Sequence, residues 1–194
     1  MLERSLGFYR KFVGAVIADY DSVRHYQAKY HGQNIPAYRL PFDLARKIGL
    51  QMMASVRLMQ SLDSAKVPLL PQVLSRLIRH VYGAEIHWRA EISPGVSLIH
   101  GTGLVVSHAA RVGPGCILFQ NVTLGEGLHP ETRKVGAPSL GLDVHVGPGA
   151  TLIGPIEIGD RTKIMAGAVV TRSVPADSLV RPAEPVVTPR KSPT

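Results

Sequence analysis

The sequence predicts an α+β protein in which a helical region precedes a β-solenoid made of six-residue repeats. Up to about Tyr82, apolar residues recur at helical spacing among charged ones. After Gly83, Gly and Pro become frequent, and large aliphatic residues recur at every sixth position. Neither a helix, with its period near 3.6, nor a strand, with its period of 2, requires this spacing. A unit of one short strand and one tight turn cannot bury its own apolar side, whereas stacked units can, so the repeat indicates a solenoid.

We expect the N-terminal helical region to span residues 1–83. Its three apolar-periodic segments are separated by stretches that hold Gly, Asn and Pro, as connections should. Gly83 provides a stop for the last helix. The stretch "MMASVRLM", residues 52–59, suggests a methionine-rich binding face or a core, and its helical spacing favours the core.

We expect the solenoid to span residues 84–182 and a C-terminal tail to follow at 183–194. The repeat breaks at "GEGLHPETRKVGAPS", which predicts a protruding loop at about 126–138. Earlier, the phase slips by two residues between Leu104 and Val106. Three units would form one triangular turn of about 18 residues, with large aliphatic side chains inside and smaller ones at the corners.

The inward aliphatic positions are Ile86, Ile92, Leu98, Leu104, Val106, Val112, Leu118, Leu124, Leu140, Val146, Leu152, Ile158, Ile164 and Val170. The smaller positions are Ala90, Val96, Thr102, Ala110, Cys116, Val122, Val144, Ala150, Thr162 and Ala168. Cys116 is therefore expected to be a packed thiol rather than a reactive one.

Composition limits the partners and the location. Lys and Arg outnumber Asp and Glu by 22 to 14 among 194 residues, which favours an anionic partner such as nucleic acid, a membrane surface or a phosphorylated small molecule. No interleaving of aromatic and basic residues supports nucleic-acid binding. No stretch approaches 18 consecutive apolar residues, so we expect no membrane insertion. The single cysteine excludes an internal disulfide, and the start of the chain lacks the pattern of a cleaved secretory signal, so we expect a cytoplasmic location.

Four stretches carry a resemblance to a known family. They are "YGAEIHWRAEISPGVSLIHGTGLVVSHAARVG", "QNVTLG", "IEIGDRTKIMAGAVVTRSVP" and "RPAEPV". Together they resemble the hexapeptide-repeat acyltransferases, and more narrowly the serine O-acetyltransferases. The resemblance implies a left-handed parallel β-helix, and a homotrimer or dimer of trimers whose active sites lie between subunits.

A histidine and a carboxylate form the candidate catalytic pair. Acyl transfer to a hydroxyl needs a base for the hydroxyl proton, and histidine is the usual choice at neutral pH. His100 lies in "LIHGTG", at the third place of its repeat, so its side chain should point outward. Glu85 precedes it by 15 residues, which would place the two on adjacent coils. The resemblance implies that an acid at Glu85 pairs with His100, where it would hold the imidazole tautomer and stabilise its charged form.

The chain departs from the serine enzymes at positions that hold the acceptor. The resemblance implies an Asp directly before the catalytic histidine, where this chain has Ile99. It also implies an Arg-His-Pro stretch in the long loop, where residues 136–138 read Gly-Ala-Pro. His129, earlier in the loop, is a candidate replacement for the second catalytic histidine, with Arg133 and Lys134 supplying charge. The alternative to a role of these residues in the active site is that they form a solvated polar loop.

The resemblance implies acetyl-coenzyme A (acetyl-CoA) as co-substrate, and no metal is expected. The pantetheine arm would lie outside the coils against small residues, which keep backbone amides reachable. The matching positions are Gly125, Pro148, Ala166 and Gly167. His108 and His145 lack the spacing of a three-histidine zinc site, and His87 is expected to be structural.

Three functions remain open. The first is acetyl-CoA-dependent acetylation of L-serine, and the second is the same chemistry on the hydroxyl of a sugar or specialised metabolite. The third is a non-catalytic solenoid scaffold, which the pairing of His100 with Glu85 argues against.

Overall fold

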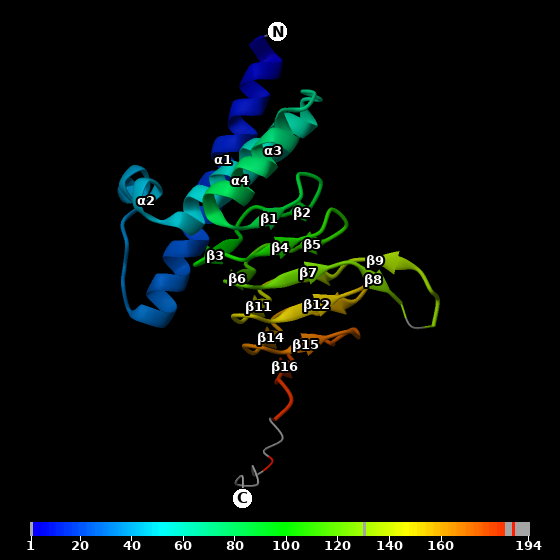
Figure 1. Cartoon of the computed structure of the whole chain (residues 1–194). Coiled ribbons are helices and arrows are strands. Elements are labelled where there is room, and N and C mark those ends of the chain that lie inside the picture. Colours follow the sequence, from blue (N-terminus) through cyan, green and yellow to red (C-terminus); the bar gives the residue numbers. More distant parts are fainter. Residues whose placement is uncertain (1, 130, 185–187, 189–194) are drawn as a thin grey trace, which may run out of the picture.

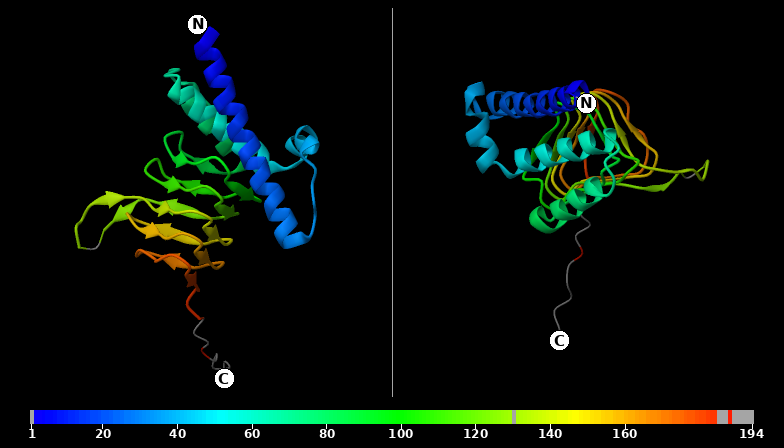
Figure 2. Two further views of the ribbon diagram at one scale, coloured as in Figure 1. Left: turned by 180° about the vertical axis from the view of Figure 1, so that it is seen from behind. Right: turned by 90° about the horizontal axis from the view of Figure 1, so that it is seen from above.

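The structure, a computed structural model, describes residues 2–129, 131–184 and 188, so most of the predicted tail lies outside it (Figure 1). Helices cover one end of a stack of coils, and the chain runs down the stack toward its C-terminus. Figure 2 shows that α1, α3 and α4 lie across this end and that α1 continues down one side. The helical elements are α1 (Leu2–His31), η1 (Ala37–Arg39), α2 (Leu40–Arg46), α3 (Ile48–Ser64) and α4 (Leu70–Tyr82).

The methionine-rich stretch lies in the core, as predicted. Met52, Met53, Val56 and Met59 of α3 are at most 1 % exposed. They belong to the same hydrophobic cluster as the interior of the coils, so α3 closes the apolar end of the solenoid. Helix α4 ends at Gly83, whose φ of 62° is a left-handed conformation that glycine adopts readily.

The coils form three parallel sheets, which enclose a narrow triangular interior. Sheet A holds β1 (Glu85–Ile86), β4 (Val105–Val106), β7 (Thr123–Gly125), β12 (Thr151–Ile153) and β15 (Val169–Val170). Sheet B holds β2 (Glu91–Ile92), β5 (Arg111–Val112), β10 (Ser139–Leu140) and β13 (Glu157–Ile158). Sheet C holds β3 (Ser97–Ile99), β6 (Ile117–Phe119), β11 (His145–Val146), β14 (Lys163–Ile164) and β16 (Leu179–Val180).

The predicted inward aliphatic residues are all buried, and so are the smaller corner residues with one exception. Thr102 is exposed, and Leu104 occupies the corner position instead, two residues before the inward Val106. The phase slip therefore lies between Leu98 and Leu104, earlier than the sequence suggested. Because Leu104 follows Leu98 by six residues, the sequence pattern gave no sign that two residues are inserted between them.

Two insertions interrupt the regular coil. Val105 pairs with Thr123, and Thr151 with Val169, a spacing of 18 residues. In the first coil Glu85 pairs with Val105, a spacing of 20, so two residues are added. Thr123 pairs with Thr151, a spacing of 28, so that coil carries ten extra residues. These form an antiparallel hairpin of β8 (Gly127–Leu128) and β9 (Val135–Gly136) that projects from the stack (Figure 1).

A buried ion pair joins the helical region to the first coil. Arg57 of α3 donates to both carboxylate oxygens of Asp19 in α1, at 2.8 and 2.9 Å, and both side chains are buried. Arg57 also donates to the carbonyl oxygens of Ile92 and the following residue, at 2.5 and 2.7 Å. Asp19 accepts from the amides of Gly95 and the following residue, at 2.9 and 3.2 Å. Every polar atom of this pair is thus hydrogen-bonded, as buried charges require.

Other helix side chains bind the same free edge of the first coil. Gln60 Nε2 donates to the carbonyl oxygens of Ala90 and Ile92, at 3.3 and 3.1 Å. Ser75 Oγ donates to the carbonyl oxygen of Ile86 at 2.7 Å. These contacts fix the orientation of the first coil, which carries His100.

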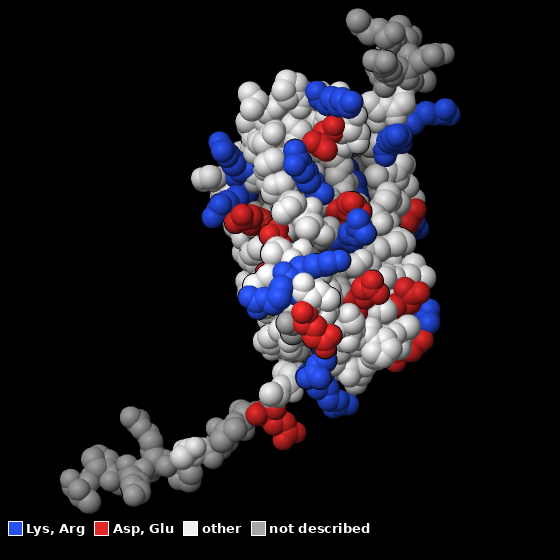
Figure 3. Space-filling model, turned by 90° about the vertical axis from the view of Figure 1, so that its right-hand side faces the viewer, with Lys and Arg blue, Asp and Glu red and all other residues white. Residues whose placement is uncertain are grey.

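The surface carries charges of both signs. On the face seen in Figure 3, basic and acidic side chains are interspersed rather than gathered into one basic patch. None of the helices in the described part of the chain has both the length and the hydropathy needed to cross a membrane.

Candidate active site

His100 lies on the turn created by the two-residue insertion, between β3 and β4. Its φ of 59° is uncommon for a residue with a side chain, and that side chain is exposed, as predicted. The neighbouring Gly101 is buried, and a Cβ there would lie 2.7 Å from Sδ of Met52. A Cβ on Gly49 of α3 would overlap the carbonyl oxygen of Leu98. Helix α3 therefore packs directly behind the turn, whose His100 and Thr102 side chains face solvent.

Glu85 opens the first coil, and His100 lies near the end of the same coil rather than on an adjacent one. Glu85 pairs with Val105, five residues after His100, and its amide donates to the carbonyl oxygen of Leu104 at 2.8 Å. Its carboxylate is exposed, 3.4 Å from Nη1 of Arg79 in α4. Within the described residues, no hydrogen bond joins Glu85 to His100. The fold brings the two to the same edge of sheet A without forming the contact.

His129 lies at the tip of the hairpin, away from His100. Its amide donates to the carbonyl oxygen of Lys134, and its own carbonyl oxygen accepts from the Arg133 amide. Its Nδ1 accepts from the amides of Glu131 and Thr132, at 3.3 Å each. The imidazole therefore holds the tip of the hairpin together. Because the β3–β4 turn and the hairpin leave sheet A at opposite edges, one chain does not unite the two histidines (Figure 1).

Three of the four predicted cofactor positions lie at the corner between sheets C and A, below His100. Gly149 donates its amide to the carbonyl oxygen of Gln120, and Gly167 donates to that of Pro148, so these turns stack coil upon coil. Pro148, Ala166 and Gly167 belong to this stack. Gly125 ends β7 at the opposite edge of sheet A, where its carbonyl oxygen accepts from the Gly154 amide at 3.1 Å. The corner offers a line of small residues beneath the histidine.

An apolar surface replaces the expected acid beside His100. Ile99 pairs with Phe119 on the next coil, and the Phe119 ring lies 6.4 Å from that of Tyr26 in α1. In the hairpin, a Cβ on Gly136 would lie 2.8 Å from Cβ of Pro155, so the base of the hairpin is packed tightly against the coil. The acceptor side of the site therefore differs from the pattern that the resemblance implied.

A polar cluster at the base of the hairpin was not singled out from the sequence. Glu126 Oε1 lies 2.7 Å from Nδ1 of His108 and accepts a hydrogen bond of 2.6 Å from Ser107 Oγ. The His87 ring stacks on Trp88 at 3.8 Å and lies 5.4 Å from that of His108. Burial, then the nearby His108, lowers the pKa of His87. The spacing of the coils could have revealed this cluster from the sequence. Residues 87, 107 and 126 follow one another at intervals of 20 and 19, close to the length of one coil, so they lie near one another on successive coils.

Cys116 is buried and donates to the carbonyl oxygen of Gly141 at 3.1 Å. Burial raises the pKa of its thiol to about 12, so the prediction of a packed, unreactive cysteine is confirmed. Groups of three or more His, Cys, Asp or Glu side chains placed to hold a metal are absent from the described residues.

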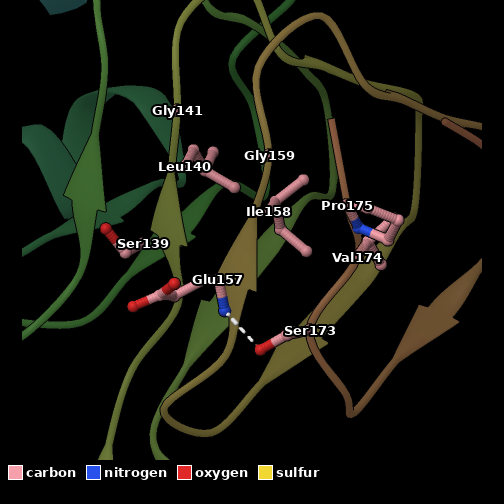
Figure 4. Close-up of a pocket in the computed structure, with 9 residues that line it drawn as sticks. All are labelled: Ser139, Leu140, Gly141, Glu157, Ile158, Gly159, Ser173, Val174 and Pro175. Carbon is pink, nitrogen blue, oxygen red and sulfur yellow. Dashed lines mark hydrogen bonds between the residues drawn. The ribbon is translucent and has the colours of Figure 1, made fainter. Parts of the chain in front are cut away.

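A shallow hollow of about 530 Å³ lies on sheet B, away from the corner that carries His100 (Figure 4). Its walls come from β10, β13 and the segment 173–175, and the amide of Glu157 donates to Ser173 Oγ at 3.0 Å. Glu157 is the one titratable residue among those that line it. The hollow therefore offers no acid–base pair for acyl transfer.

The chain is similar to known serine acetyltransferases. No family model matches it. It is 39% identical to the serine acetyltransferase of Synechococcus elongatus over 132 residues, which are 68% of this chain and 53% of that protein. It is 35% identical to the Helicobacter pylori serine acetyltransferase over 131 residues, or 67% of this chain and 75% of that protein. The chain thus spans about half the length of the cyanobacterial relatives that it matches.

The fold is also similar to that of a solved serine acetyltransferase structure. The crystal structure of Neisseria gonorrhoeae serine acetyltransferase in complex with serine superposes with a TM-score of 0.77 and 26% identity, covering 94% of this chain and 72% of that one. The predicted left-handed parallel β-helix behind a helical region is therefore confirmed. By sequence identity, coverage and fold, the chain belongs to the serine acetyltransferase family.

Proposed function

We propose that the protein transfers the acetyl group of acetyl-CoA to the hydroxyl of L-serine, releasing O-acetyl-L-serine and CoA. Membership of the family and the serine complex of a structural neighbour support this activity. The observation that carries it is the exposed His100, held in a left-handed backbone conformation by the packing of α3.

In the proposed mechanism, His100 is the general base. It takes the proton of the acceptor hydroxyl as the oxygen attacks the thioester carbonyl carbon. The tetrahedral intermediate then collapses, the carbon–sulfur bond breaks, and the CoA thiolate takes a proton from the imidazolium. Glu85 would stabilise the imidazolium after its carboxylate turns from Arg79 toward His100.

Acetyl-CoA would lie along the corner between sheets C and A. Pro148, Ala166 and Gly167 would let the pantetheine arm approach the backbone, and Gly125 would serve at the opposite edge of sheet A, facing a neighbouring subunit. The excess of Lys and Arg suits the phosphates of this co-substrate.

We further propose that the site is completed by a second copy in a homotrimer or a dimer of trimers. His100 and the His129 hairpin leave opposite edges of sheet A, so they can meet only across a subunit boundary. The outward side chains of β4, β7, β12 and β15 are Val105, Thr123, Thr151 and Val169, an uncharged surface between the two edges.

Complementation tests the shared site. Deleting residues 127–136 removes the hairpin and restores the 18-residue spacing. The deletion variant and His100→Ala should each be inactive alone but recover activity when co-expressed, because mixed oligomers contain sites with both parts intact. If the mixed oligomers recover no activity, the proposal of a shared site is contradicted. It is also contradicted if light scattering shows that the fully active protein is a monomer.

A second acceptor class is favoured by one observation. Ile99 and Phe119 form an apolar surface beside His100, where serine would need partners for its ammonium and carboxylate. Two lost charge-assisted contacts, at about 1.5–3 kcal/mol each, would weaken serine binding by about two to four decades. The alternative acceptor is therefore the hydroxyl of a sugar or specialised metabolite.

A thiol-release assay with acetyl-CoA decides between the acceptors, using L-serine, homoserine and hydroxylated sugars. Efficient turnover of serine supports the first proposal, and its loss in Arg133→Ala, Lys134→Ala or His129→Ala would show that the hairpin replaces the missing partners. Turnover of a sugar alone would favour the second class. The cytoplasmic location stays a prediction from the sequence.

A further inference from the structure

Gln120 occupies a position in the corner between sheets C and A, between the turn that carries His100 and the predicted cofactor positions. Phe119 pairs with Ile99, and the amide of Asn121 donates to the carbonyl oxygen of Thr102 at 2.9 Å, so Gln120 lies directly beneath the turn that carries His100. Leu118 pairs with Val146 and Val146 with Ile164. Counting two residues onward from each places Gln120 above Pro148 and Pro148 above Ala166. These residues therefore form one column down the corner.

Among the residues that the structure describes, Gln120 is one of two with a buried side-chain oxygen, Oε1, that has no hydrogen-bond partner. A buried carbonyl oxygen without a partner is unfavourable, so such an atom in a native structure requires an explanation, and a functional role is one. Turning this oxygen toward a ligand would break no hydrogen bond at the oxygen. A ligand N–H group would instead supply the hydrogen-bond partner that the oxygen lacks.

The chemistry of the donor matches this position. For the acetyl group to reach a hydroxyl held by His100, the thioester must lie at the top of the column and the pantetheine arm must run downward. The first amide of that arm follows the sulfur after two methylene groups, a distance comparable to the spacing of adjacent strands, about 4.8 Å. A side-chain amide one coil below His100, such as that of Gln120, would therefore lie at the level of the first pantetheine amide.

We propose that Gln120 binds the pantetheine amide nearest the thioester, pairing its own amide with that N–H and carbonyl. This assignment rests on the proposed use of acetyl-CoA and adds a donor-binding residue between the catalytic turn and the small residues below. Gln120 would act by holding the thioester in register with His100 and would take no part in proton transfer.

Binding of two probes tests the assignment. Isothermal titration of the full chain with CoA should show a Kd raised at least about fivefold in Gln120→Met, as expected for two lost hydrogen bonds. The Kd of adenosine 3′,5′-bisphosphate, which keeps phosphates but lacks the pantetheine arm, should not change. In turnover, the KM for acetyl-CoA should rise while the KM for the acceptor stays the same, and the pH dependence of kcat should not change because Gln120 takes no part in proton transfer.

Gln72 in α4 supplies the matched control, because its Oε1 is likewise buried without a partner among the described residues. Gln72→Met should leave both Kd values unchanged, and neither variant should lower the melting temperature. Equal CoA binding by wild type and Gln120→Met would overturn the assignment while leaving the proposed function standing. A wild-type protein that binds no CoA would overturn both.

Discussion

The two interruptions of the six-residue rhythm differ in how the fold supports them. The two-residue insertion at His100 is backed by α3, with Gly101 buried and Gly49 in contact with the strand before it. The ten-residue hairpin projects from the stack, and Leu128 and Val135 in its strands are 49 % and 66 % exposed. The short insertion thus forms a turn that is packed against a helix, whereas the long one forms an arm whose strands are largely exposed.

Under the proposed function, this difference separates two tasks of the site. A general base works best when its position is fixed before the substrate arrives, and the packed turn would fix His100 in this way. The hairpin is packed against the coil only at its base, so its exposed tip could adapt to an acceptor. The following predictions test this division.

The largest effect is expected from His100→Ala. Turnover should fall by about 10²–10⁴ while the fold stays intact, because a general base is lost without a cavity in the core. His129→Ala should cost about tenfold or less, since its ring is engaged in the hairpin tip. Steady-state kinetics and circular dichroism measure both. Near-normal turnover in His100→Ala would place the base elsewhere, with His129 the first residue to test.

Gly49→Ala should destabilise the protein by about 3 kcal/mol, because the new methyl group meets backbone that cannot move aside. Gly101→Ala should cost about 1 kcal/mol, since it meets the flexible side chain of Met52. Gly14→Ala in α1 is the control, because no atom lies within 4 Å of its added Cβ and it should stabilise by up to about 1 kcal/mol. Urea unfolding gives all three values. Equal stability of the Gly49 and Gly14 variants would disprove close packing behind the His100 turn.

A smaller effect concerns pH. His145 of sheet C forms a hydrogen bond of 3.3 Å with the Tyr30 hydroxyl of α1. Burial, followed by the charges of Lys163 and Lys29, lowers the pKa of His145, and the nearby Asp143 opposes this shift. The unfolded chain takes up a proton near pH 6.5 while the folded one does not, so stability should fall as pH drops through that value. His145→Gln should flatten the dependence of stability on pH in unfolding curves at pH 5–8. An unchanged slope in His145→Gln would refute this attribution.

The smallest effect on stability is expected from removing the hairpin. Deleting residues 127–136 should change the free energy of unfolding by about 1 kcal/mol or less, since loop length contributes weakly and the hairpin strands are largely exposed. Thermal unfolding of the deletion variant tests this. A loss of several kcal/mol would mean that the hairpin is part of the core rather than an arm.

The sequence predicts the solenoid well because each repeat must bury a large aliphatic residue at the same place. It misplaces the first insertion, since Leu104 follows Leu98 by six residues and mimics a repeat while occupying a corner. The ten-residue insertion was recognised because its polar residues break the pattern outright. A periodicity argument therefore detects long interruptions more reliably than short ones.

The candidate site was predicted only where a residue type has a distinctive chemistry. His100 stands out by its neighbours and its position in the repeat. Gln120 does not, because its unpaired oxygen depends on the packing around it and no sequence pattern reports that. The pairing of Glu126 with His108 likewise depends on which residues stack between coils.

The helix side chains that bind the first coil also decide how the molecule behaves toward copies of itself. A parallel β-stack ends in a row of unpaired amides and carbonyls, on which another chain can add strands without limit. Here Asp19, Arg57, Gln60 and Ser75 occupy several of those groups, so this end is closed to edge-to-edge growth. Weakening these contacts would expose a template for fibre formation. The helical region thus keeps a repetitive fold finite as well as supporting the turn that carries His100.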